Sequence, residues 1–209
     1  MQADRMEAFM FTKQMKILVM VLAAFICSGA AYADDVLEAI QEATEAYNEK
    51  AYTEAVESLE YAKQLIQQLT SEGLKNFLPK PLEGWEAKEA KSQNLGMMGG
   101  SAGIEQEYWK AGSGNQRRSR VTMTIMGESP MFQGMMGMFN PAIVGSTGGK
   151  LRKIKRNKAI VKYSADNRDG EIMINVDKKY LVIVKGSNVD EKDLMNYANA
   201  LDYKGLKSF

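Results

Sequence analysis

The side chains that most often carry out chemistry in proteins are scarce in this chain. It contains no histidine, and its single cysteine is Cys27. Without histidine, a Ser-His-Asp triad, a Cys-His pair, a histidine-held haem and an ordinary zinc site are excluded. No glycine-rich segment has the spacing of a phosphate-binding or dinucleotide-binding loop. We therefore expect no cofactor, and we look for function among the thioethers, amines and carboxylates.

Methionine is the most unusual of the remaining groups. Four methionines lie within eight consecutive positions, namely Met131, Met135, Met136 and Met138. Thioethers are soft ligands that select Cu(I), so handling of Cu(I) or Ag(I) by this segment is an alternative function. Methionine also fills irregular cores and forms adaptable contact surfaces. Since glycines interrupt the segment, we expect a loose apolar helix that packs on a sheet or on a partner.

Positive charge is concentrated in the later part of the chain. Residues 34–77 carry ten acidic and three basic side chains, whereas residues 78–209 carry 21 basic and 14 acidic ones. The candidate partner-binding residues are Arg117, Arg118, Arg120, Lys150, Arg152, Lys153, Lys155, Arg156 and Lys158. If the strands that carry them are neighbours, they form one positive patch that docks the acidic residues 34–77 or binds an anionic surface or partner. A solvated strand face would show the same pattern.

Carboxylates offer the remaining route to catalysis. Glu105 and Glu107 share one face of an expected strand, and Asp166, Asp169 and Glu171 lie close together in the sequence. Two carboxyl groups that flank a substrate can catalyse hydrolysis. A carboxylate-dependent hydrolase is therefore a second alternative, although exposed strand edges often carry such acids. We expect no catalytic residue in the chain.

The first 33 residues have the form of a secretion signal. Lys13 and Lys16 precede an apolar run over residues 17–27, and a small-residue cleavage site ends at Ala33. We expect an exported protein, periplasmic in the first instance and extracellular as the alternative. The cleaved chain would contain no second apolar run long enough to span a membrane. Nucleic acid is not expected as a partner of an exported chain that carries 24 basic and 24 acidic residues once residues 1–33 are removed.

Residues 34–73 predict an acidic pair of helices. Apolar residues recur at helical spacing on both sides of a break at residues 48–50, and Gly73 follows the last expected turn. The spacing is similar to that of one tetratricopeptide repeat at Ala43, Tyr52, Ala55, Leu59 and Ala62. That resemblance implies a helix-packing unit, but a single repeat has no stacked neighbour with which to form a peptide groove. We expect a plain αα-hairpin that packs on the body or dimerises.

Residues 171–185 predict the centre of the remaining fold. An alternating run is followed by a polar break at residues 177–179 and by the apolar run Tyr180–Val184. This pattern is typical of a β-hairpin, and its second strand is apolar on both faces. We therefore expect a central strand that is covered on both sides.

Further strands and helices surround this hairpin in the sequence. Strands are expected over residues 85–93, 103–111, 118–126, 151–156 and 158–164. A helix is expected over residues 130–145, with a break near Asn140 and Pro141, and a last helix is expected to begin at Ser187. The segment over residues 74–84 contains two prolines and is expected to be an extended junction.

These elements predict an α+β protein. We expect an antiparallel sheet of about six or seven strands with two packing helices, preceded by the αα-hairpin. The domains are then a cleaved signal (1–33), the hairpin (34–73), the junction (74–84) and the α+β domain (85–209). The element order resembles that of secreted domains of the PsbP/Mog1 type, which implies a fold and no site residue. Our functional hypothesis is an exported, non-enzymatic binding or accessory module that contacts a protein partner or a second copy.

Overall fold

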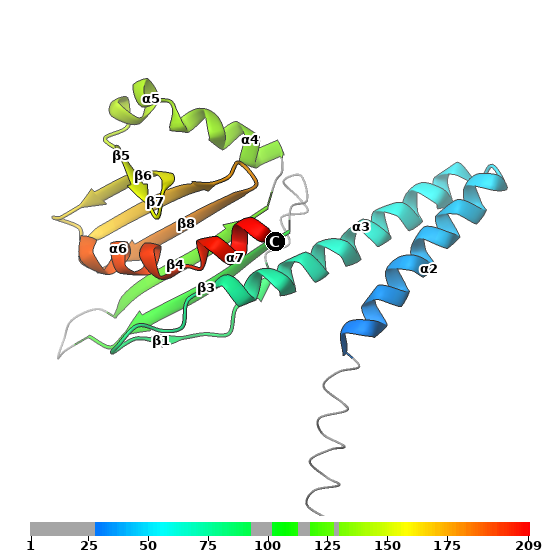
Figure 1. The fold of residues 1–209 in the computed structure, drawn as a ribbon, viewed down its shortest axis with the longest axis horizontal. Coiled ribbons are helices and arrows are strands. Elements are labelled where there is room, and N and C mark those ends of the chain that lie inside the picture. Colours follow the sequence, from blue (N-terminus) through cyan, green and yellow to red (C-terminus); the bar gives the residue numbers. More distant parts are fainter. Residues whose placement is uncertain (1–27, 93–101, 113–117, 128–129) are drawn as a thin grey trace, which may run out of the picture. The chain divides into compact units, whose positions relative to one another are not determined.

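In a computed structural model of the protein, the described residues are 28–92, 102–112, 118–127 and 130–209 (Figure 1). The chain divides into two compact units, one ending at Ile66 and the other comprising Gln67–Phe209. Most of the predicted secretion signal lies outside the described residues and stays a prediction. None of the helices in the described ranges combines the length and the apolar character that crossing a membrane requires.

The first unit is a helical hairpin, as predicted. Helix α2 (Ser28–Asn48) and the first part of α3 (Tyr52–Leu74) run antiparallel and are joined by a short turn at Lys50, whose φ is +63°. The turn closes through the amide of Ala51, which donates to the carbonyl oxygen of Ala46 at 2.9 Å. Small side chains are buried in the hairpin, namely Ala39, Ala43, Ala46, Ala55 and Ala62. Small residues allow two helices to pack closely together.

The second unit, which we call the body, is an antiparallel sheet with helices on both faces. Its strands are β1 (Glu86–Ala87), β2 (Lys91–Ser92), β3 (Gly103–Lys110), β4 (Ser119–Met126), β5 (Lys150–Ile154), β6 (Asn157–Ser164), β7 (Asp169–Val176) and β8 (Tyr180–Ser187). Seven of the eight strands follow the order β1-β3-β4-β8-β7-β6-β5, and the eighth, β2, pairs with β3 beside this path. The predicted α+β class and the antiparallel sheet are confirmed.

Strand β8 is the central strand that the sequence predicted. It lies between β4 and β7, and its residues 181–184 are all buried. Alternate residues belong to two separate apolar clusters: Val182 and Val184 to one, Leu181 and Ile183 to the other. The strand is therefore covered on both faces, which is why its sequence is apolar without alternation.

Helices α6 (Glu191–Ala200) and α7 (Tyr203–Ser208) cover the first face of the sheet (Figure 1). The rings of Tyr108 and Tyr197 meet there with centroids 4.5 Å apart, and burial raises the pKa of Tyr197 to about 12. Gly170 and Gly186 form a cross-strand pair beneath α6. A Cβ at either glycine would come within 2.8 Å of a Leu194 side-chain atom, so the pair gives α6 room to approach the sheet.

The second face is covered by the methionine-rich segment. Its elements are α4 (Pro130–Met136), the 3₁₀ helix η3 (Gly137–Phe139) and α5 (Pro141–Ser146). Asn140 caps α5 by accepting a hydrogen bond from the Ala142 amide at 3.0 Å. The predicted helix with a break near Asn140 is therefore confirmed. Phe132 and Val144 are buried against the strands of this face.

Several predicted element bounds were wrong. Helix α3 continues past Gly73 to Leu74 and is followed by a 3₁₀ turn. Gly73 makes room for a ring instead of ending the helix, because a Cβ there would lie 2.6 Å from Phe209 Cζ. Ser187 belongs to β8, where it pairs with Arg120, and α6 begins only at Glu191. The single strand expected over residues 85–93 is two short strands, β1 and β2, which both pair with β3.

Candidate functional site

The turn between β5 and β6 carries two cationic side chains on residues whose φ angles are positive. Lys155 and Arg156 occupy the two turn positions with φ of +45° and +72°. Two-residue hairpin turns favour positive φ at both positions, which normally selects Asn and Gly. For other residues this conformation costs about 1–3 kcal/mol each. The sequence placed the strand break at Asn157, but Asn157 is the first residue of β6, so that boundary was wrong.

Asn157 holds this turn from beneath. Its side chain is buried, with 4% of the residue's surface exposed. Its Nδ2 donates to the carbonyl oxygens of Ile154 at 3.3 Å and Lys155 at 3.2 Å. The buried amide therefore ties the turn to the end of β5. It fixes the backbone from which the Lys155 and Arg156 side chains extend.

The corner between α6 and α7 lies opposite the turn. Asp202 caps α7, because its Oδ1 accepts from the Gly205 amide at 3.0 Å. Tyr203 is buried and donates its hydroxyl to the Ala198 carbonyl oxygen, and burial raises the pKa of the Tyr203 phenol. The corner is therefore held by a cap and a buried hydrogen bond, while Lys204 extends from its surface.

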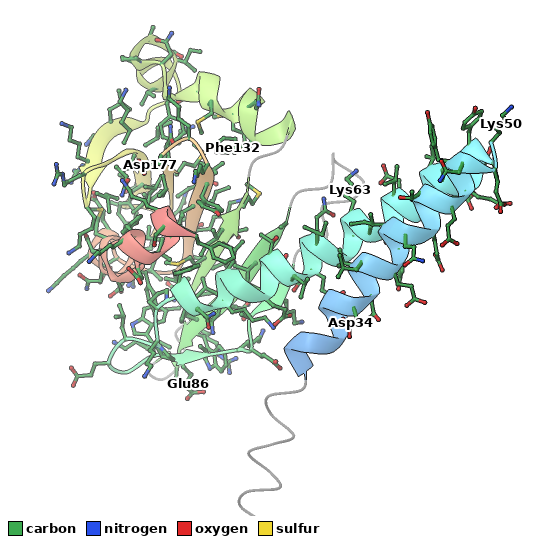
Figure 2. All side chains as sticks on the ribbon, turned by 45° about the vertical axis from the view of Figure 1, so that its right-hand side comes forward. Asp34, Lys50, Lys63, Glu86, Phe132 and Asp177 are labelled. Atoms are coloured by element: carbon green, nitrogen blue, oxygen red, sulfur yellow. The ribbon has the colours of Figure 1, made fainter. Side chains whose placement is uncertain are left out.

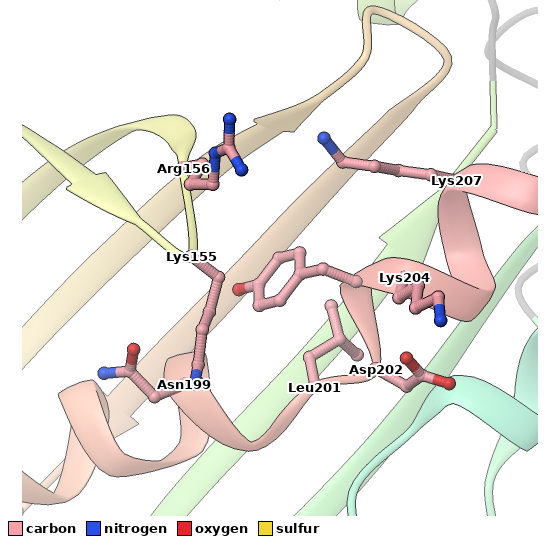
Figure 3. Close-up of a pocket in the computed structure, with 8 residues that line it drawn as sticks. Lys155, Arg156, Asn199, Leu201, Asp202, Lys204 and Lys207 are labelled. Carbon is pink, nitrogen blue, oxygen red and sulfur yellow. The ribbon is translucent and has the colours of Figure 1, made fainter.

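Between the turn and the corner is an open cleft of about 710 Å³, which we call the basic cleft (Figure 3). Its lining residues are Lys155, Arg156, Asn199, Leu201, Asp202, Tyr203, Lys204 and Lys207. Four of these side chains are cationic and one is a carboxylate. Figure 3 shows Lys155 and Arg156 on one side of the cleft and Lys204 and Lys207 on the other.

Positive charge in the basic cleft is only partly neutralised. Lys207 Nζ lies 3.0 Å from Asp177 Oδ1. Within the described ranges, no carboxylate lies within ion-pair distance of Lys155, Arg156 or Lys204. Asp202 is engaged in capping α7. A concave site lined by one sign of charge focuses the field and attracts anions, so the cleft is built to receive negative charge.

The structure separates the predicted basic residues instead of joining them in one patch. Arg118 and Arg120 precede or lie on β4, and three strands, β8, β7 and β6, separate β4 from β5. Arg120 Nε also lies 3.5 Å from Glu107 Oε2, so part of its charge is neutralised. Arg117 lies outside the described residues. A single positive patch was expected only if neighbouring strands carried these basic residues. Strands β4 and β5 are not neighbours, so that condition is not met.

The rest of the predicted group lies on or beside β5. Lys153 and Lys158 are cross-strand partners, and Arg152 Nη2 lies 3.5 Å from Glu191 Oε1. Lys150 is exposed at the start of β5. Of the eight predicted residues in the described ranges, only Lys155 and Arg156 line the basic cleft.

Sequence reasoning missed the other wall of the cleft. Lys204 and Lys207 lie about fifty positions after the turn and are brought to it only by the packing of α7 on the sheet. Their spacing of three residues on a helix was the one available signal, because it places both on one side.

The described methionines of the segment pack against the sheet. Met135, Met136 and Met138 are half-buried and pack against the apolar cluster on the second face of the sheet. The side chain of Met131 is not among those described. The described residues also contain no group of three or more acidic, cysteine or histidine side chains that could hold a metal ion. Packing is therefore the role in which the structure places these three thioethers, and handling of Cu(I) or Ag(I) by the segment stays a prediction.

The acids on β3 have partners within the body. Glu107 Oε1 lies 2.6 Å from Lys88 Nζ, and this hydrogen bond, with the nearby Arg120, lowers the pKa of Glu107. Glu105 accepts a hydrogen bond from the Thr124 hydroxyl at 3.3 Å. A carboxyl group whose pKa is lowered stays ionised and is a poor general acid.

Two of the acids near the β6–β7 turn, Asp169 and Glu171, also have partners. A shallow hollow of about 550 Å³ includes Asp169 and Glu171 in its lining. Asp169 accepts from the Asn188 amide at 3.1 Å, and Glu171 Oε1 lies 3.5 Å from Lys185 Nζ. These contacts give the hydrolase hypothesis no support.

Comparison with known proteins adds no assignment to this geometry. The chain matches no protein-family model, no curated protein and no solved structure. The resemblances to PsbP/Mog1-type domains and to a tetratricopeptide repeat therefore stay predictions. The basic cleft is therefore the feature from which a function can be inferred.

Proposed function

We propose that this protein is an exported, non-enzymatic binding module that recognises an acidic segment of a partner protein through the basic cleft. The observation that carries the proposal is the excess of cations in one concave site. Lys155, Arg156 and Lys204 face an open cleft without an ion pair in the described structure. Bringing like charges together is unfavourable unless a counter-charge binds.

The strained turn supports the same proposal. Two adjacent residues with positive φ would be replaced by Asn-Gly if stability alone mattered, because that pair adopts the turn without strain. Lys155 and Arg156 instead keep their charges at the mouth of the cleft. Strained backbone tends to occur where a side chain has a function.

The chemistry of the cleft favours a carboxylate-bearing protein segment. Arg156 can bind a carboxylate through two parallel hydrogen bonds, and the lysines add point charges around it. The cations come from one turn and one short helix and do not extend along the sheet, so the arrangement does not follow a nucleic-acid backbone. Such charges mainly accelerate association and select the partner. We therefore expect fast binding that weakens as salt rises.

The experiment compares two matched charge-reversal variants of the full chain. The first carries Lys155→Glu, Arg156→Glu and Lys204→Glu; the control carries Lys150→Glu, Lys153→Glu and Lys158→Glu, which alter exposed residues outside the cleft. Binding of a fluorescent Glu-rich peptide is measured by anisotropy at several salt concentrations. We expect the cleft variant to lose at least tenfold in affinity and the control much less. Equal losses, or no binding by the wild type, would overturn the proposal.

Thermal unfolding separates binding from folding. All six positions are exposed, so each variant is expected to unfold within about 0.5 kcal/mol per substitution of the wild type. In-cell crosslinking of the same variants, followed by mass spectrometry, then identifies the natural partner. A partner captured by the control and lost from the cleft variant would carry the acidic segment.

A further inference from the structure

The helical hairpin buries its small residues and exposes large ones. The side chains between the helices are mainly alanines. Large apolar side chains on its surface include Leu37, Ile40, Tyr47, Tyr52, Val56 and Leu59, whose exposed fractions run from 41% at Ile40 to 65% at Leu37 and Tyr47. We call these six residues the hairpin face. Figure 2 shows side chains projecting along both helices, with Lys50 at the turn. Such a pattern is unfavourable for a hairpin surrounded only by water.

The six residues lie on one side of the hairpin. Leu37, Ile40 and Tyr47 form a stripe on α2 at helical spacing, and each lies on the same side of the alanine seam. A second stripe on α3 contains Tyr52, Val56 and Leu59. Each stripe is offset by about a quarter turn from its own seam, in the same rotational sense along its helix. Because the helices run antiparallel, equal offsets bring the stripes to a single side.

The end of the hairpin agrees with this placement. Tyr47 is near the end of α2 and Tyr52 is the first residue of α3. Their ring centroids lie 5.8 Å apart, with the planes tilted by 59°. Aromatic pairs at this separation are in favourable contact. The two stripes therefore meet at the turn and form a continuous apolar surface.

The acidic residues of α2 are turned away from the hairpin face. Helical spacing places Glu38, Glu42 and Glu45 on the opposite side of α2 from Ile40. On α3, the margin of the face is formed by Lys63, whose Nζ lies 3.1 Å from Glu60 Oε2. None of the six residues of the hairpin face is acidic, and Glu60, which borders the face four residues after Val56, is paired with Lys63.

We propose that the hairpin face binds the hairpin face of a second copy, so that two hairpins form a four-helix bundle. Two-helix hairpins with short loops are the usual halves of such bundles. A two-fold dimer requires a surface complementary to itself. An apolar face meets that condition when the acids of α2 point away from it and the bordering Glu60 is paired with Lys63. Six large side chains at about half exposure offer an area approaching the roughly 800 Å² that one partner contributes to a standard interface.

A lipid surface fits the same face less well. Helices that lie in a membrane interface carry Lys and Arg on the polar side, which attracts anionic headgroups. The polar side of this hairpin is rich in glutamate instead. Its charge would be repelled by such a surface, so the second copy is the occupant that the chemistry favours.

The first test is photo-crosslinking in cells that express the full chain. A photoreactive phenylalanine analogue replaces Leu59 in one variant and Tyr61 in the control. Tyr61 is as exposed as Leu59, at 52% against 54%, but two residues further along the helix it points to the other side of α3. We expect a product of twice the chain's mass, containing only this chain, from Leu59 and not from Tyr61. A product with another protein, equal products from both sites, or no product from Leu59 would overturn the proposal.

The second test measures mass in solution by light scattering. The variant with Ile40→Glu and Leu59→Glu is expected to be monomeric where the wild type is a dimer, whereas Tyr61→Glu is expected to remain dimeric. Far-ultraviolet circular dichroism checks that both variants keep the helical content of the wild type. A wild type that is monomeric at concentrations of about 100 µM, or a dimer that survives the double substitution, would contradict the bundle. A dimer with a Kd of about 10 µM would be mostly associated at this concentration.

Discussion

The hairpin and the body bury apolar side chains in opposite ways. In the body, large residues such as Tyr197, Leu194 and Ile172 are fully buried. In the hairpin, alanines are buried while Leu37 and Leu59 remain more than half exposed. Burying a large apolar side chain contributes about 1.5–3 kcal/mol, and an alanine contributes much less. The body therefore contains the means of its own stability, whereas the hairpin depends on what covers its exposed face.

The largest expected effect tests this contrast directly. Leu194→Ala removes a fully buried side chain that packs over Gly170 and Gly186, so it should lower the free energy of unfolding of the body by about 2–5 kcal/mol. Leu59→Ala in the hairpin should change the unfolding of the body by less than about 0.5 kcal/mol. Both tryptophans, Trp85 and Trp109, lie in the body, so tryptophan fluorescence during urea unfolding reports that unit alone.

Comparable losses from the two leucine variants would remove the contrast. They would show that the hairpin and the body unfold as one cooperative unit. Far-ultraviolet circular dichroism, recorded in the same titration, reports both units and would then coincide with the fluorescence.

A smaller change in stability is expected from substitutions in one turn of each unit. Lys50 in the hairpin and Arg156 in the body both have positive φ, at +63° and +72°. Replacing either residue by glycine should relieve strain and stabilise its own unit by up to about 1 kcal/mol. Arg156→Gly should also weaken binding of the Glu-rich peptide, while Lys50→Gly should leave that binding unchanged. If Arg156→Gly bound the peptide as tightly as the wild type, the strained turn would have no role in the basic cleft.

The smallest change in stability is expected from breaking one ion pair in each unit. Glu107 in the body is mostly covered, with 24% of its side chain exposed, and its pKa is lowered by the hydrogen bond from Lys88. Its ionised form therefore stabilises the folded state above its unfolded pKa of about 4.5, and this contribution is lost as the pH falls through the lower folded pKa. We expect Glu107→Gln to destabilise the body by about 0.2–1 kcal/mol at pH 7 and not at all at pH 2. Urea titrations at the two pH values measure this difference.

The matched hairpin variant is Glu60→Gln. Glu60 pairs with Lys63 at 3.1 Å, but its side chain is 58% exposed. Water screens such a pair, so its contribution should be near zero at both pH values. An equal effect at Glu60 and Glu107 would mean that burial in the body does not strengthen its ion pairs.

Much of the fold was predictable because its signals are local and repeated. The continuous apolar run of β8 predicted a strand covered on both faces, and the Asn140-Pro141 break predicted the start of α5. The ends that were wrong depend on distant residues. Ser187 resembles a helix cap locally, yet its backbone pairs with Arg120 on β4. Gly73 resembles a helix stop, yet it makes room for Phe209.

The candidate site was only half predictable for the same reason. The cations Lys155 and Arg156 were recognised as part of a basic run, but Lys204 and Lys207 come from the last helix. Only the packing of α7 on the sheet places them opposite the turn. The run itself also misled, because its other members lie along β5 and β6 and do not line the cleft.

Because β5 is an edge strand, the cations on it that do not line the cleft affect solubility. Among the described strands, β5 pairs only with β6 and so forms one border of the sheet. An open border is a template on which another chain can add a strand, and such growth leads to fibres. Lys150, Arg152 and Lys153 occupy three of its five positions. If the β5 edges of two molecules met, these like charges would lie opposite one another. Lys150, Arg152 and Lys153 therefore help to prevent edge-to-edge pairing of sheets.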